Sequence, residues 1–100
     1  MLTIAHIIAQ LPSNISRLLP AEVEDFAPLL MNLHRSDGAK PRAIMTTLDD
    51  RGWSVTVDGV ADLGKPGRQA GSRGHWPSMR HAFLVALLLC ERPELPIEGA

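Results

Sequence analysis

The sequence predicts a mostly helical α+β domain, with a two-stranded antiparallel hairpin packed on a hydrophobic C-terminal helix. Three observations lead to this fold class. Apolar residues recur at helical spacing near the N-terminus, apolar and polar residues alternate after position 52, and residues 82–90 form an unbroken apolar run. With 100 residues, of which 45% are hydrophobic, the chain has the size and composition of one domain over 1–100.

Two helices are predicted in the first third of the chain. Residues 3–11 carry apolar side chains at positions i, i+3, i+4 and i+7, which predicts a short amphipathic helix. Residues 20–35 show a similar apolar stripe, and Pro20 suits the first turn of a helix. Pro28 lies inside that stripe, so we expect a kink, or a break with a restart, between Asp25 and Pro28.

A third helix is predicted over residues 40–51. Pro41 suits its first turn and Gly52 suits its C-terminal end. Three apolar side chains between them are expected to face the core. These are Ile44, Met45 and Leu48.

The sequence period then changes from about 3.6 to 2 residues, which predicts a β-hairpin over residues 53–63. Apolar residues at positions 53, 55 and 57 alternate with Ser54 and Thr56. Asp58-Gly59 follows, and apolar residues then resume. An Asp-Gly pair between two such stretches is typical of a two-residue hairpin turn.

An exposed loop is predicted over residues 64–75. Positions 64–74 contain four glycines and no apolar side chain larger than that of Ala70. Pro77 opens a final helix over 77–91, whose apolar side chains point in every direction, so most of its sides must be covered. Residues 92–100 are predicted to be a loosely held tail.

The composition also limits where the chain is expected to act. The net charge is −1, so a basic coat for nucleic acid and a polyanion mimic are both excluded. Cys90 is the single cysteine, which fits a reducing compartment. The longest apolar run, Ala82 to Cys90, is far shorter than the roughly 20 residues that span a bilayer, and the N-terminus lacks the positive charge of a signal peptide. We expect a cytoplasmic protein with no membrane partner.

No catalytic, metal-binding or cofactor-binding signature is present, so we expect no enzyme activity and no cofactor. His6, His34, His75 and His81 do not have the spacing of a zinc-binding motif. Cys90 lies among leucines, which favours a buried thiol over a nucleophile. The glycines of positions 64–74 match neither the phosphate-binding loop nor the dinucleotide-binding pattern.

The first predicted binding surface is a basic loop, which we define as Lys65, Arg68, Arg73, His75 and Trp76. Glycine spacing allows the cationic side chains to reach a phosphate backbone or an acidic protein surface. For Trp76 two alternatives remain open. Its indole could stack on a base or fill a partner's pocket, or it could be buried beneath the final helix.

The second predicted binding surface is acidic and consists of Glu22, Glu24 and Asp25. In one interpretation these acids only complement the positive end of a helix dipole. In the other they meet a basic groove on a partner. Separation of this surface from the basic loop would give the chain a dipolar surface suited to protein docking.

The C-terminal half of the chain resembles small proteins of bacteriophages and mobile elements. In several of these, an aromatic strand precedes a final helix that begins with a Pro-x-x-Arg-Ala-type sequence. The resemblance is carried by Trp53, Pro77, Arg80 and Ala82, with His81 inserted before Ala82. The size and the compact α+β plan also resemble the anti-CRISPR inhibitors, which bind CRISPR surveillance complexes and block DNA recruitment or strand pairing. That family is defined by activity and shares no motif, so the resemblance implies no functional residue.

These observations lead to one expected function and one alternative. The chain is expected to be a non-enzymatic protein-binding inhibitor of the anti-CRISPR type, which docks on a nucleic-acid-handling complex and blocks the binding of target DNA. The alternative is a small nucleic-acid-binding or regulatory protein that uses the basic loop. The sequence does not indicate an oligomeric state.

Overall fold

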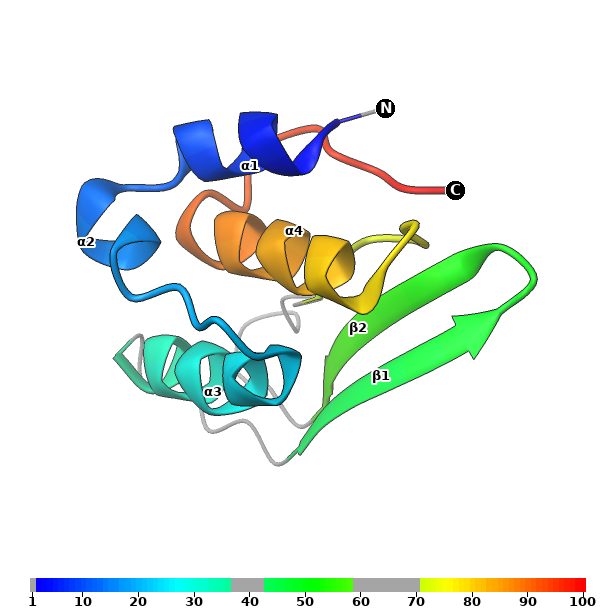
Figure 1. The fold of residues 1–100 in the computed structure, drawn as a ribbon, viewed down its shortest axis with the longest axis horizontal. Helices are drawn as coiled ribbons and strands as arrows, with labels where there is room; N and C mark the ends of the chain where they lie inside the picture. Colours follow the sequence, from blue (N-terminus) through cyan, green and yellow to red (C-terminus); the bar gives the residue numbers. More distant parts are fainter. Residues whose placement is uncertain (1, 37–42, 59–70) are drawn as a thin grey trace.

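A computed structural model of the chain describes residues 2–36, 43–58 and 71–100. It has the predicted α+β fold, in which the helices lie to one side of a two-stranded antiparallel sheet (Figure 1). The elements follow one another as α1 (Ile4–Gln10), α2 (Ser13–Ser16), the 3-10 helix η1 (Val23–Asp25), α3 (Phe26–Ser36), β1 (Ala43–Asp49), β2 (Gly52–Asp58) and α4 (Met79–Glu91).

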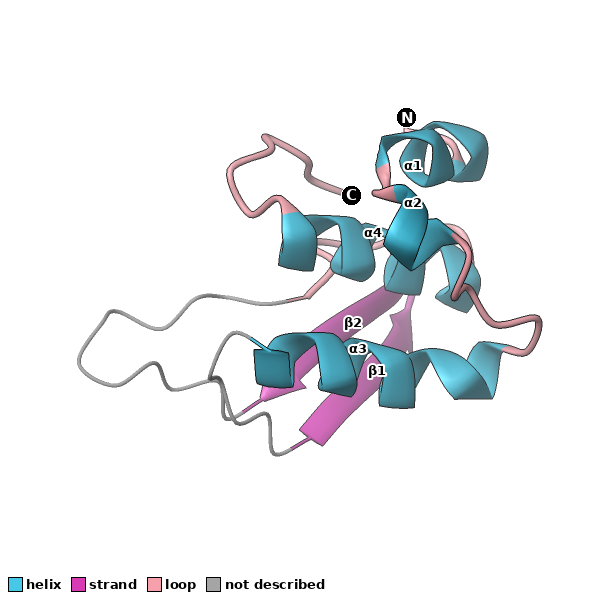
Figure 2. Cartoon of the chain, turned by 90° about the vertical axis from the view of Figure 1, so that its left-hand side faces the viewer, coloured by secondary structure: helices cyan, strands magenta, loops and turns pink. Residues whose placement is uncertain are grey.

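Helix α4 forms the centre of the fold, as its continuous apolar sequence predicts. Its nine residues from His81 to Leu89 are all buried. It lies between α1 and α3 and contacts β2, so different sides of the helix meet different elements (Figures 1 and 2). Ser78 caps its N-terminus by accepting a hydrogen bond from the His81 N–H at 3.0 Å. No helix within the described ranges is long and apolar enough to cross a membrane.

The chain changes helix type between Val23 and Phe26. A 3-10 turn ends at Asp25, and α3 starts at Phe26. Pro28 therefore falls in the first turn of α3, where its missing N–H removes no hydrogen bond of the helix. Phe26 is fully buried and stacks on Phe83 of α4, with ring centroids 5.6 Å apart.

The prediction of a helix over residues 40–51 is wrong. Residues 43–49 form strand β1, which pairs with β2 from Ala43 opposite Asp58 to Asp49 opposite Gly52. A helix would leave the hydrogen-bonding edge of β2 open, whereas the strand satisfies it, and tertiary pairing outweighs a short apolar pattern. The hairpin turn is therefore Asp50-Arg51. The partner strand predicted at positions 60–63 lies outside the described residues.

The prediction of an exposed loop is wrong for residues 71–75. Residues 71–76 run alongside β2, and Trp53 and Trp76 exchange N–H···O bonds of 2.8 and 2.7 Å. Ser72 is fully buried, and its N–H donates to the Val55 oxygen at 2.9 Å. A side chain at Gly71 would collide with that same oxygen, so glycine is needed here for close approach of two backbones. Positions 64–70 of the predicted loop lie outside the described residues.

The tail after α4 is held in place, contrary to the prediction of a loose segment. The Gly99 N–H donates to the Arg73 oxygen at 2.8 Å, and His75 and Ala100 exchange N–H···O bonds of 3.0 and 3.1 Å. Leu95 and Ile97 pack against the core. The tail thus lines the outer side of residues 73–75, which lie within the segment that runs alongside β2. These long-range pairings give no local sequence pattern.

Candidate protein-binding surface

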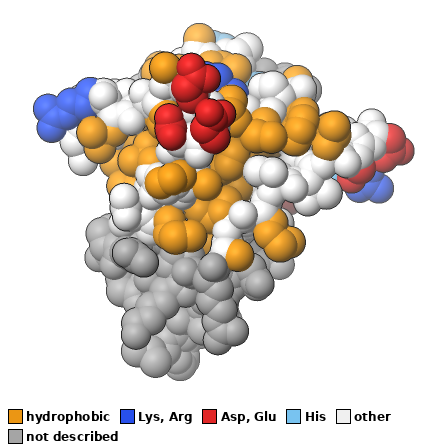
Figure 3. Space-filling view, turned by 60° about the horizontal axis from the view of Figure 1, so that its bottom comes forward, with side chains coloured by type: hydrophobic (Ala, Val, Ile, Leu, Met, Phe, Trp, Pro, Cys, Tyr) orange, Lys and Arg blue, Asp and Glu red, His pale blue; other side chains and the backbone are white. Residues whose placement is uncertain are grey.

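The acidic surface is the segment from Glu22 to Asp25, just before α3. The side chains of Glu22, Glu24 and Asp25 are exposed, and no cation within the described ranges forms an ion pair with them. Figure 3 shows acidic side chains gathered together, with hydrophobic side chains close by on the same face. The acids are therefore available to a partner, and no cation in the part of the chain that the structure describes forms an ion pair with them.

Arg80 of α4 holds this acidic segment in place. Its Nη1 donates to the Pro20 oxygen at 3.2 Å and is 3.5 Å from the Ala21 oxygen. Its guanidinium carbon lies 5.2 Å from the centre of the Phe26 ring, within the range of a cation–π contact. The arginine that carries part of the sequence resemblance thus binds the backbone before the acids and contacts the side chain of the residue that follows them. The backbone that leads into the three acids is therefore anchored to α4.

The basic loop is not assembled as the sequence suggests. Lys65 and Arg68 lie outside the described residues. Arg73 is described, and its guanidinium is occupied by the tail: Nη1 donates to the Leu95 oxygen at 2.8 Å and Nη2 to the Pro93 oxygen. Arg73 also adopts a positive φ of 49°, a conformation that L-residues seldom take. The partly buried guanidinium thus binds the tail.

His75 is likewise occupied within the chain. Its Nε2 lies 2.9 Å from Oδ2 of Asp49, and its Nδ1 lies 2.9 Å from the Ala100 oxygen. The pKa of Asp49 is lowered, first by the hydrogen bond that its carboxylate accepts from the Arg51 N–H and further by His75. His75 thus links the hairpin turn to the tail.

Trp76 follows the buried alternative. Only 2% of its surface is exposed, and its indole stacks on the His81 ring with centroids 4.9 Å apart. The indole N–H donates to the Ser72 oxygen at 2.9 Å. This ring is part of the core, so the prediction that Trp76 belongs to a partner-binding surface is wrong in this structure.

Ser72 has a role that the sequence did not reveal. Its hydroxyl accepts the Val55 N–H at 3.0 Å and donates to the Gly74 oxygen at 2.8 Å. Its backbone N–H and C=O are also bonded, to Val55 and Trp76. One serine thus joins β2 to the segment 71–76. Its position among glycines offered no signal, since serine is common in exposed loops.

Exposed apolar residues on β1 were also missed. Met45 is 52% exposed and Leu48 is 58% exposed, although both were expected to face the core. Because the segment is a strand, Met45 lies on the opposite sheet face from Val55 and Val57. Leu48 shares the face of those valines but lies opposite Trp53, near the hairpin turn, where it stays exposed. The adjacent β-branched residues Thr46 and Thr47 were the available sign of a strand.

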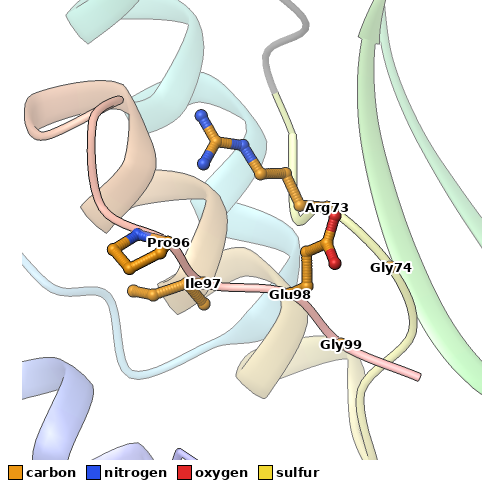
Figure 4. Close-up of a pocket in the computed structure, with 6 residues that line it drawn as sticks. All are labelled: Arg73, Gly74, Pro96, Ile97, Glu98 and Gly99. Atoms are coloured by element: carbon orange, nitrogen blue, oxygen red, sulfur yellow. The ribbon is translucent and has the colours of Figure 1, made fainter.

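A depression of about 730 Å³ lies between residues 73–74 and the tail. Its lining consists of Arg73, Gly74, Pro96, Ile97, Glu98 and Gly99. Figure 4 shows the guanidinium of Arg73 extending away from the carboxylate of Glu98. Because the charged groups do not converge on one point, the depression has no arrangement suited to acid–base chemistry. Within the described ranges, no three His, Cys, Asp or Glu side chains are placed to share a metal ion.

Comparison of the chain with protein-family models, with curated proteins and with solved structures found no match.

Proposed function

We propose that this chain is a non-enzymatic protein-binding inhibitor that acts in the cytoplasm and docks through its acidic segment. The observation that carries the proposal is the exposed set of Glu22, Glu24 and Asp25, with which no cation of the described ranges forms an ion pair. Arg80 holds the backbone beside them, so little ordering entropy is lost when a partner binds. A basic protein surface is the complementary partner.

Two features favour a protein partner over nucleic acid. Phosphate would be repelled by the acidic segment, and nucleic-acid affinity depends on the number of cations that reach phosphates. Arg73 and Arg80 both donate to backbone carbonyl oxygens of the chain itself, and Trp76 is buried. The other two cations of the basic loop, Lys65 and Arg68, lie outside the described residues.

The resemblance to anti-CRISPR inhibitors suggests which class of partner to test first. A CRISPR surveillance complex binds nucleic acid through basic grooves, and an acidic segment placed over such a groove would exclude target DNA sterically. A phage-encoded inhibitor of this kind needs no catalytic group.

The experiment compares two variants with equal charge change. In the first, Glu22, Glu24 and Asp25 are all changed to Lys. In the second, which is the control, the exposed acids Glu91, Glu94 and Glu98 are changed to Lys. Each purified protein is added to surveillance complexes, and both complex binding and target-DNA binding are measured.

The proposal expects the unchanged chain and the tail control to bind and to inhibit, and the acidic-segment variant to lose at least about tenfold in affinity. Equal behaviour of the two variants would remove the acidic segment from the interface. A mobility shift of DNA or RNA that weakens steeply with salt, and that disappears when Lys65 and Arg68 are changed to Ala, would support the nucleic-acid alternative instead.

A further inference from the structure

Among the described residues, strand β1 is an edge strand without the usual protection against pairing. Within the described part of the chain, only β2 pairs with it, and Figure 1 shows it on the outer side of the hairpin. Residues 43–48 contain no charge, no proline and no glycine. Natural edge strands are normally blocked by such residues, by bulges or by a covering element, because an open edge invites another strand.

The direction of the free backbone groups follows from the bonds of β2. Val55 and Trp53 use both their N–H and their C=O toward the segment 71–76, through Ser72 and Trp76. Since a residue in an antiparallel ladder directs both groups to the same side, neither is bonded to β1. Their cross-strand partners, Thr46 and Leu48, therefore direct their own N–H and C=O away from β2.

Because backbone direction alternates along a strand, Ile44 also directs its N–H and C=O away from β2. Residues 44, 46 and 48 thus present their backbone donors and acceptors along the free edge, and no hydrogen-bond partner is present for them in the described ranges. These positions are symmetric about Thr46. Residues 45, 47 and 49 direct the same groups inward to β2.

We propose that β1 pairs with β1 of a second copy of this chain, antiparallel, about a two-fold axis at Thr46. Thr46 then lies opposite Thr46 of the second copy, and Ile44 lies opposite its Leu48. Each of these opposed pairs exchanges two backbone hydrogen bonds, which joins the two hairpins into one continuous sheet. The C₂ arrangement is closed, so it gives a dimer and not a fibre.

In this register the side chains of β1 are complementary to those of β1 in the second copy. On the face shared with Val55, the exposed Leu48 meets Ile44 of the second copy. On the other face Met45 meets Thr47, and Asp49 lies beside Ala43, so no like charges are opposed. This self-complementarity favours a second copy over an unrelated peptide. A single strand on each side gives a small interface, so we expect a dissociation constant in the micromolar range or weaker.

The test uses lysine at two neighbouring positions of the same strand. Thr46→Lys places two like charges directly opposite each other at the axis, whereas Thr47→Lys places each lysine opposite a methionine. Sedimentation equilibrium over a range of roughly 1 μM to 1 mM should show the unchanged chain rising from 10.9 kDa toward twice that mass. Thr47→Lys should follow the unchanged chain, and Thr46→Lys should weaken the dimer by about tenfold or more.

Two further measurements keep the proposal testable if Thr46→Lys does not fold. Thr46→Pro removes only an N–H that faces the free edge, so the hairpin keeps its ladder while the dimer is lost. Amide exchange should also show concentration-dependent protection at residues 44, 46 and 48 but not at 45 and 47. A chain that stays monomeric throughout, equal dimerisation by both lysine variants, or binding of a foreign extended peptide without self-association would overturn the proposal. The acidic-segment variant should still dimerise, which separates this outcome from the proposed function.

Discussion

The change Ser72→Ala tests whether one buried hydroxyl joins the sheet to the following segment. The substitution leaves the Val55 N–H, on a residue that is 1% exposed, without the acceptor that now lies 3.0 Å away. An unsatisfied buried donor costs about 1–3 kcal/mol. The partly buried Gly74 oxygen also loses its donor, but water can replace that donor in part. We therefore expect a loss of about 2–3 kcal/mol, a large fraction of the roughly 5–15 kcal/mol that stabilises a typical domain.

The assay is urea unfolding at neutral pH, followed by far-ultraviolet circular dichroism. The midpoint should fall while the slope with denaturant concentration stays the same, because the fold is unchanged. Ser54→Ala is the matched control, since Ser54 is only half-buried and lies on the other face of β2, and it should cost no more than about 0.5 kcal/mol. If Ser72→Ala were as stable as Ser54→Ala, the hydrogen bond from the Val55 N–H to the Ser72 hydroxyl would not contribute to stability as argued.

Two further predictions concern the core and the hairpin turn. Leu84→Ala should cost about 2–5 kcal/mol in the same assay because the side chain is fully buried in α4, whereas Leu18→Ala, at a residue 54% exposed, should cost about 0.5 kcal/mol or less. Similar losses at both positions would contradict the central place of α4. The lowered pKa of Asp49 gives stability that is present above its unfolded pKa and is lost as the pH falls through its folded pKa. Asp49→Asn should therefore destabilise the chain at pH 7 and have little effect near pH 2, as measured by unfolding at each pH; an equal effect at both would rule out this linkage.

The parts of the fold that could be predicted are those with a local signal. The apolar run of α4 gives one interpretation, because a helix apolar on all sides must be surrounded. The break before α3 follows from Pro28, whose ring restricts where a helix can start. The alternating residues of β2 likewise identify a strand without reference to its partners.

The errors arose where distant pairing decides the structure. Ile44, Met45 and Leu48 fit one face of a helix, and pairing of this segment with β2 selects the strand instead. Gly71 belongs to the predicted exposed loop, yet it allows two backbones to approach closely. The choice between surface and core for Trp76 depends on its stacking with His81 and its bond to Ser72, neither of which has a fixed spacing in sequence.

The place of β2 between two partners also determines what a partly folded chain exposes. The hairpin with β1 closes through a two-residue turn, and such local pairing forms within microseconds. The pairing of Trp53 with Trp76 must close a much longer loop, which is slower. Until that loop closes, the edge of β2 that pairs with residues 71–76 in the native chain is open, and the valines of β2 are not yet buried. A partly folded hairpin therefore has two open strand edges, whereas the described part of the native chain has one, on β1. Conditions that delay the return of residues 71–76 should therefore favour aggregation over folding.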